Sequence, residues 1–143
     1  AGDARRAREA GATGVMVSNH GGRQLDGTPA PFDCVKAMRD EVGDALELVV
    51  DGGVRRGTHI VKALAAGADA CSVGRAYLYG LAAAGEAGVA RAIAILQSEL
   101  ERDMTLLGCC SLADLGPAHV RRRGEPDPTA SPPRPPARLG AAS

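Results

Sequence analysis

An imidazole and a guanidinium stand three positions apart in a polar run, residues 18–26, whose letters are SNHGGRQLD. A histidine side chain such as that of His20 can accept a proton from a hydroxyl group or from the carbon that bears one. Arg23 offers a planar pair of N–H donors that matches a carboxylate. The pair predicts a site for a substrate with adjacent hydroxyl and carboxylate groups. The alternative is that both are ordinary solvent-facing loop residues.

Two further glycine loops each carry arginine. The first loop, residues 51–56, has the letters DGGVRR, and the second contains Gly74 and Arg75. Consecutive glycines expose backbone N–H groups that can converge on an anion, and the N-terminus of a following helix adds a favourable potential. The loops therefore predict a phosphate site. The residues by themselves do not decide whether Arg55 or Arg56 would contact that phosphate.

Each of the three loops follows a short apolar run with β-branched residues. We interpret these runs as strands buried on both faces, at residues 14–19, 46–50 and 70–73. Helices are predicted between them, then a short helix at 76–84, and a long amphipathic one after Gly85 that ends at Gly108. Side-chain caps are expected at the starts of the first three helices, from Asp3, Asp33 and Thr58.

The alternation of helices and strands predicts an α/β protein with a parallel sheet under right-handed crossovers. An open doubly wound sheet and a (β/α) barrel both fit this order. The candidate residues follow the carboxyl ends of all three strands, as they do in barrel active sites. This position favours the barrel, although open sheets also bind ligands at that edge.

Composition excludes some classes of function. Lys plus Arg and Asp plus Glu number 17 each in 143 residues, so the net charge of zero predicts no nucleic-acid partner. No stretch approaches the roughly 18 apolar residues of a membrane span, and no signal peptide is recognised. The four cysteines lack metal-ligand spacing and are interpreted as small buried residues in a reducing compartment. His59 and His119 have no recognisable partners and are interpreted as surface or helix-packing residues.

The chain divides into two parts. Residues 1–120 form the predicted domain, and residues 121–143 a disordered tail. Six of the nine prolines lie beyond position 125, mixed with Ala, Arg, Gly and Ser. Such a segment cannot bury enough apolar surface to offset the entropy of ordering it.

Residues 18–26, 51–57 and 74–80, in that order, resemble the FMN-dependent α-hydroxy-acid oxidases and dehydrogenases, a family that includes glycolate oxidase, L-lactate dehydrogenase, mandelate dehydrogenase and flavocytochrome b2. The likeness covers residues 1 to about 120. The run around His20 is specific to this family, whereas the Asp-Gly-Gly loop is shared with other FMN barrels. The resemblance implies a TIM (β/α)8 barrel, of which this chain supplies the C-terminal part, strands 6–8 and their helices.

The resemblance also implies a role for each motif residue. His20 would be the catalytic base and contact the substrate, and Arg23 would bind the substrate carboxylate. It assigns the cofactor phosphate to Arg55 rather than Arg56. The residues expected to contact FMN are Ser18, Asp51, Gly52, Gly53, Val54, Arg55, Gly74 and Arg75.

The function so implied is FMN-dependent oxidation of an L-2-hydroxy acid, similar to lactate or glycolate, to the 2-oxo acid. The electron acceptor is left open among oxygen, a quinone, a cytochrome or another carrier. A homotetramer is expected for the full-length protein, in the cytoplasm or peripheral to the membrane. The alternative is a truncated, inactive remnant that binds flavin or phosphate. The family's early strands and the Asp that pairs with the base are not in this sequence, so turnover by this chain alone is not expected.

Overall fold

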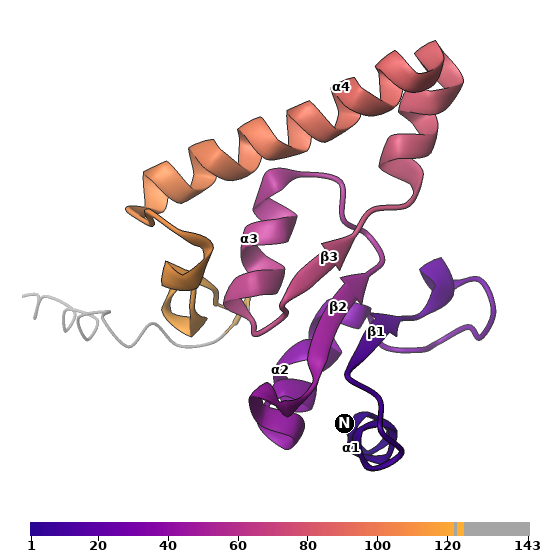
Figure 1. Cartoon of the computed structure of the whole chain (residues 1–143), viewed down its shortest axis with the longest axis vertical. Helices are drawn as coiled ribbons and strands as arrows, with labels where there is room; N and C mark the ends of the chain where they lie inside the picture. The colour runs from indigo at the N-terminus through magenta and orange to yellow at the C-terminus, as the bar shows by residue number, and fades with distance from the viewer. Residues whose placement is uncertain (122, 125–143) are drawn as a thin grey trace, which may run out of the picture.

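Helices and strands alternate along the chain in a computed structural model, which describes residues 1–121, 123 and 124 (Figure 1). The predicted order is confirmed. The predicted tail falls almost entirely on residues outside the described part. The elements are α1 (Gly2–Glu9), β1 (Gly14–Ser18), α2 (Pro31–Val42), β2 (Glu47–Asp51), α3 (Gly57–Ala65), β3 (Ala70–Ser72) and α4 (Arg75–Leu107).

The three strands form one parallel sheet in the order β1-β2-β3. Ser18 pairs with Asp51, and Asp51 in turn pairs with Ser72 on the other side. Because parallel strands end at the same edge of a sheet, this register brings the three following loops together. The predicted parallel α/β sheet is confirmed.

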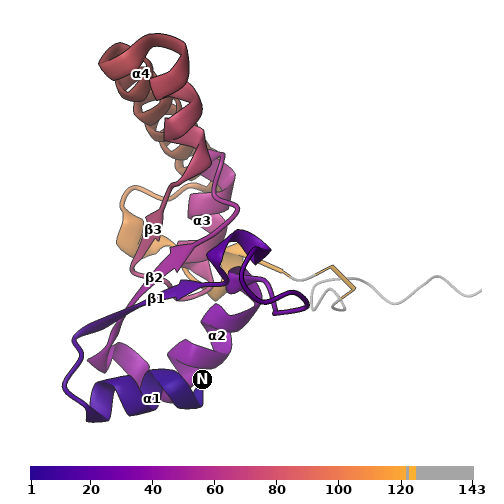
Figure 2. The same ribbon diagram turned by 90° about the vertical axis from the view of Figure 1, so that its right-hand side faces the viewer.

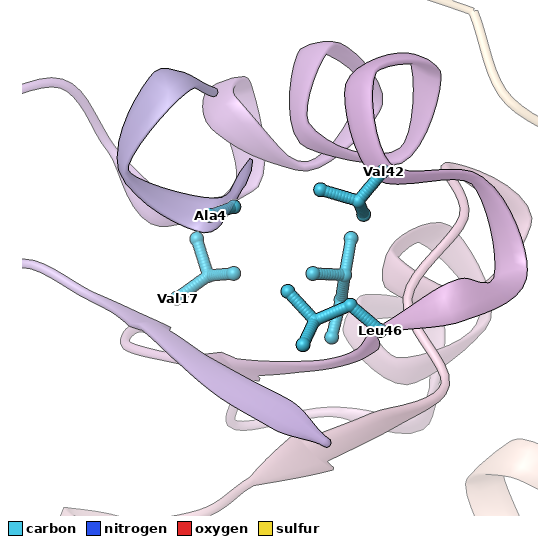
Figure 3. Packing of buried hydrophobic residues seen from close by; sticks show 5 residues of the cluster. Ala4, Val17, Val42 and Leu46 are labelled. Carbon is cyan, nitrogen blue, oxygen red and sulfur yellow. The ribbon is translucent and has the colours of Figure 1, made fainter. Parts of the chain in front are cut away.

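One face of the sheet packs against α1, α2 and α3. Around β1 and β2, a cluster of five buried residues joins the sheet to α1 and α2 (Figure 3). A second cluster joins Val35 of α2 and Val50 of β2 to residues of α3 and the turn after it. Leu48 and Val35 are completely buried. Full burial of each such side chain contributes about 1.5–3 kcal/mol.

The opposite face of the sheet is open. Met16 on this face is 60% exposed, while its neighbour Val17 is 5% exposed. Burial therefore alternates with the period of two that a one-sided sheet requires. The prediction of strands buried on both faces is wrong for this chain, because none of the described helices covers the second face.

Helix α4 consists of two arms that meet at a break. Ala84 and Gly85 have non-helical backbone angles, with φ of +58° at Gly85. The arms touch where a side chain on Gly80 or Gly88 would collide with the backbone of the other. This confirms the predicted short helix followed by a long one. Figure 2 shows the bend of α4 at the end of the molecule opposite to α1.

By length and composition alone, α4 resembles a membrane span, with a mean hydropathy of 1.3 in its apolar window and none of that window buried. The prediction that no stretch approaches such a span is therefore wrong. The apolar stretch nevertheless contains Glu86 and Arg91 as well as the break at Gly85. One such helix is weak support for a membrane association, and a kinked helix with an open apolar side explains the same composition.

The three predicted helix caps are wrong. Helices α1, α2 and α3 have no side-chain cap bond from the residue that precedes them. Helix α2 begins at Pro31, whose fixed φ suits the first helical position and which has no N–H to satisfy. Helix α3 receives its cap from Glu99 of the distant α4. The residues in the cap positions are Ala1, Ala30 and Arg56.

Candidate functional site

A single hydroxyl joins the first two predicted motifs at the carboxyl edge of the sheet. The Ser18 Oγ donates a hydrogen bond to Asp51 Oδ2 at 2.7 Å. The same oxygen accepts a hydrogen bond from the His20 backbone N–H at 3.1 Å. Because Ser18 ends β1 and Asp51 ends β2, this contact fixes the His20 loop against the start of the Asp-Gly-Gly loop.

Close contacts also connect the third motif and tighten the second. A Cβ built on Gly21 would lie 3.9 Å from Arg75 Nη2, so the Arg75 guanidinium reaches the loop after β1. A Cβ on Gly52 would lie 3.6 Å from Asn19 Oδ1 and 3.2 Å from Pro31 Cγ. Gly52 also has φ +124°, which side chains rarely adopt. The structure thus brings all three motifs together.

His20 is held in an unusual backbone conformation. Its φ is +58°, the only positive value at a non-glycine residue in the described part of the chain. Such strain persists only where the surroundings impose it, and it clusters at functional sites. Here the Ser18 hydroxyl and the bond from Gly22 N–H to Asn19 O at 2.9 Å hold the turn. The imidazole is exposed and has no polar partner among the described residues.

Arginine side chains without an ion-pair partner lie in all three loops at this edge. Arg23, Arg55 and Arg75 are exposed, and their guanidinium groups form no ion pair with any described residue. Arg56, in contrast, pairs with Glu99 at 2.8 Å. Free guanidinium groups on neighbouring loops suit an anionic ligand.

A histidine side chain that was not predicted to do so contacts the backbone of the second glycine loop. His59 Nδ1 lies 3.2 Å from the Arg55 backbone N and 3.1 Å from the Gly53 carbonyl oxygen. His59, interpreted above as a surface or helix-packing residue, thus also contacts the backbone of the second glycine loop. The signal was its place in the first turn of the helix that follows the glycines. Val54 is 7% exposed, so its side chain belongs to the core and its backbone alone is available to a ligand.

His119 also has partners, far from this site. Its Nδ1 lies 3.1 Å from the Gly116 N, and its Nε2 lies 3.5 Å from Cys109 Sγ. These contacts could not be recognised from the sequence, and they do not contradict the interpretation of His119 as a surface or helix-packing residue. Cys109 is buried, Cys34 and Cys71 are half-buried and Cys110 is exposed. The expectation of buried cysteines therefore fails at Cys110.

The loops fit the phosphate of a nucleotide cofactor. Gly53 has φ +77°, and a Cβ at that position would meet open space, so the backbone of the loop is accessible. Helix α4 begins at Arg75 without a side-chain cap, which leaves its first N–H groups available to an anion. With Arg55 and Arg75 nearby, this edge combines N–H donors and fixed positive charge.

The fold and site together define a class: a parallel α/β protein with an anion site and an exposed histidine at the carboxyl edge of its sheet. The family described as FMN-dependent dehydrogenase matches residues 1–122. The chain belongs to this family, whose cofactor is FMN.

Named relatives agree with this assignment. The chain is 49% identical over 118 residues to the pre-mycofactocin synthase of Mycobacterium tuberculosis, covering 82% of this chain and 30% of that protein. It is 50% identical over 123 residues to a peroxisomal (S)-2-hydroxy-acid oxidase of Oryza sativa, covering 86% and 34%. A solved structure of a flavocytochrome b2 variant with sulfite bound superposes with a TM-score of 0.79 at 45% identity, covering 82% of this chain and 32% of that one.

The chain spans about a third of the length of the curated relatives it matches, 30% and 34% for the two named above.

Proposed function

We propose that this chain supplies the catalytic base, the substrate-carboxylate ligand and the FMN phosphate site for the oxidation of an L-2-hydroxy acid to the 2-oxo acid. The observation that carries the proposal is the contact between the three motifs. Ser18 joins the His20 loop to Asp51, and Arg75 reaches the backbone of Gly21. A proton acceptor and anion ligands therefore share one edge of the sheet.

Each side chain has a defined task in this proposal. Arg23 binds the substrate carboxylate through its planar N–H donors. A ring nitrogen of His20 takes one of the two protons that the hydroxy acid loses on oxidation. FMN, when bound, would accept the two electrons and the other proton. Exposure of the His20 ring leaves its nitrogens free to meet a substrate.

The proposed phosphate ligands are Arg55, Arg75 and the backbone N–H groups of the Gly52–Gly53 turn. The choice of Arg55 over Arg56 is supported by the ion pair of Arg56 with Glu99. Asp51 is tied to Ser18 and orients the start of the loop. The cofactor phosphate would then lie between the loops after β2 and β3, where the sheet register brings them together.

We further propose that β1, β2 and β3 are strands 6–8 of a TIM barrel, with the open face of the sheet turned toward the barrel interior. The superposition on flavocytochrome b2 and the one-sided burial support this placement. A tetrameric, cytoplasmic or membrane-peripheral full-length protein stays a prediction. The electron acceptor is proposed only as a class: oxygen, a quinone, a cytochrome or another carrier.

A second function, flavin or phosphate binding without turnover, is favoured by one observation. The His20 ring has no orienting partner among the described residues, and a base needs such a group to hold its cationic form. By itself the chain would then bind the cofactor phosphate and leave hydroxy acids unchanged.

The test joins this chain to the N-terminal two thirds of the rice (S)-2-hydroxy-acid oxidase and measures FMN reduction without oxygen, using a panel of L-2-hydroxy acids. We expect one acid to bleach the flavin. His20→Ala should abolish bleaching, while Arg23→Lys should raise the acid concentration needed by about tenfold or more. The chain alone is the matched comparison. If FMN binds but no acid reduces it, only the second function, binding without turnover, is supported. If no FMN binds, both proposed functions are overturned.

A further inference from the structure

The start of α3 is held by a residue 42 positions further along the chain. Glu99 of α4 accepts a hydrogen bond from the Gly57 N–H at 2.8 Å through Oε2. The same carboxylate contacts Arg56 Nε at 2.8 Å through Oε1 and at 3.0 Å through Oε2. One side chain of α4 thus binds both residues that follow Arg55.

We propose that Glu99 is a positioning residue that holds Arg56 in an ion pair and thereby leaves Arg55 as the arginine that binds the cofactor phosphate. This role of Glu99 rests on the proposed phosphate site, and it explains why one of two adjacent arginines would bind the phosphate rather than the other.

The two arginines differ in the contacts that hold them. Arg56 has φ −139° and ψ +155°, an extended conformation. The Arg55 backbone N–H contacts His59 Nδ1 at 3.2 Å, which holds the start of this segment. The Arg56 side chain lies against α4 in its ion pair with Glu99, whereas Arg55 forms no ion pair with any described residue.

Burial and packing give the Glu99 contact its rigidity. The Glu99 side chain is 14% exposed, against 62% for Arg56. Gly57 is buried, and a Cβ on it would collide with the backbone of α4 at Glu99 and Leu100. Helices α3 and α4 therefore meet backbone to backbone here. The bonds from Gly57 N–H and from Arg56 hold the pKa of Glu99 below its usual range, which keeps the carboxylate charged.

Glu99 thus determines which arginine is available to a phosphate, in addition to stabilising the start of α3. While Glu99 is charged, Arg56 has a partner and a phosphate gains little from it. Without Glu99, Arg56 becomes a second unpaired guanidinium one residue from Arg55. A phosphate that loses Arg55 could then be bound by Arg56.

The test is a double-mutant comparison of FMN binding by the full chain, followed by flavin fluorescence. Arg55→Ala should raise the FMN Kd roughly tenfold or more with Glu99 present, the range of a lost charge-assisted hydrogen bond. In a Glu99→Gln background, the same substitution should raise the Kd only about two- to threefold, because Arg56 substitutes. Gln keeps an acceptor for the Gly57 N–H, so the fold is retained. Glu101→Gln, which removes an exposed carboxylate of the same helix, is the matched control.

Melting temperature separates the structural role from the selective one. An equal penalty for Arg55→Ala in both backgrounds, with only a lower melting temperature for Glu99→Gln, would overturn the inference and leave Glu99 as a helix cap. If FMN binds but Arg55→Ala has no effect with Glu99 present, the phosphate-site assignment itself fails, and the inference fails with it. A further background combines Glu99→Gln with Arg56→Ala. If Arg55→Ala raises the FMN Kd there as much as it does with Glu99 present, Arg56 is the residue that substitutes for Arg55, which supports the proposal directly.

Discussion

The two faces of the β1-β2-β3 sheet differ in what their side chains do. Toward the helices, Leu48 and Val50 are 0% and 2% exposed. On the opposite face Met16 is 60% exposed, and the same face carries the Ser18–Asp51 hydrogen bond. The covered face therefore stabilises the fold, whereas the open face and its carboxyl edge hold the candidate chemistry.

The two faces of this short sheet contribute through different physical effects. Apolar burial acts through area and is tolerant of which aliphatic residue supplies it. The polar side depends on single contacts, since one hydroxyl connects two loops and one carboxylate fixes the segment after Arg55. Substitutions on the two faces should therefore have effects of different size and on different properties.

The largest expected effect is on the free energy of unfolding. Leu48→Ala should lower it by about 2–5 kcal/mol, because the substitution leaves a cavity in the centre of the covered face. Met16→Ala on the open face should change it by less than about 0.5 kcal/mol. Urea unfolding followed by circular dichroism measures both. Similar losses for the two variants would show that the open face is covered in solution.

The covered face was predictable from sequence, because runs such as residues 46–50 are apolar and bounded by glycines. The order of elements and the meeting of the three loops followed from the same pattern. What could not be predicted depends on distant residues. No local rule shows that Glu99 would cap α3 in place of Thr58, or that the second face would stay open. The contacts of His59 could not be predicted because its partners are backbone atoms, which a sequence does not reveal.

The next effect concerns the polar link on the open face. Ser18→Ala removes the hydrogen bond to Asp51 and the acceptor of the His20 N–H. We expect a loss of about 0.5–1.5 kcal/mol in unfolding free energy and weaker FMN binding, because the loops are no longer joined. Ser72→Ala is the control, a serine of β3 that pairs with Asp51 from the other side. If both variants bind FMN equally well, the link between the motifs does not position the site.

A smaller effect on stability, with a clear effect on association, is expected for Met16→Lys. An open apolar face beside unpaired strand edges favours self-association, and a charge opposes it. Sedimentation should show less association, while the melting temperature stays nearly unchanged. Val17→Lys, one residue along on the covered face, should unfold the chain. Unchanged association of Met16→Lys would mean that copies meet elsewhere, for example along the apolar side of α4.

The smallest effect is chemical and compares a cysteine of the covered side with an exposed one. Burial raises the pKa of the Cys71 thiol to about 11. Since the thiolate is the reactive form, Cys71 should be alkylated far more slowly than Cys110 at pH 8, as peptide mapping by mass spectrometry would show. A raised pKa in the folded state also means that this thiol contributes stability below the ordinary cysteine pKa of about 8.5, and that the contribution is lost as the pH rises toward about 11. Equal alkylation rates for Cys71 and Cys110 would contradict the burial of β3 against α3, and with it the distinction between the two faces.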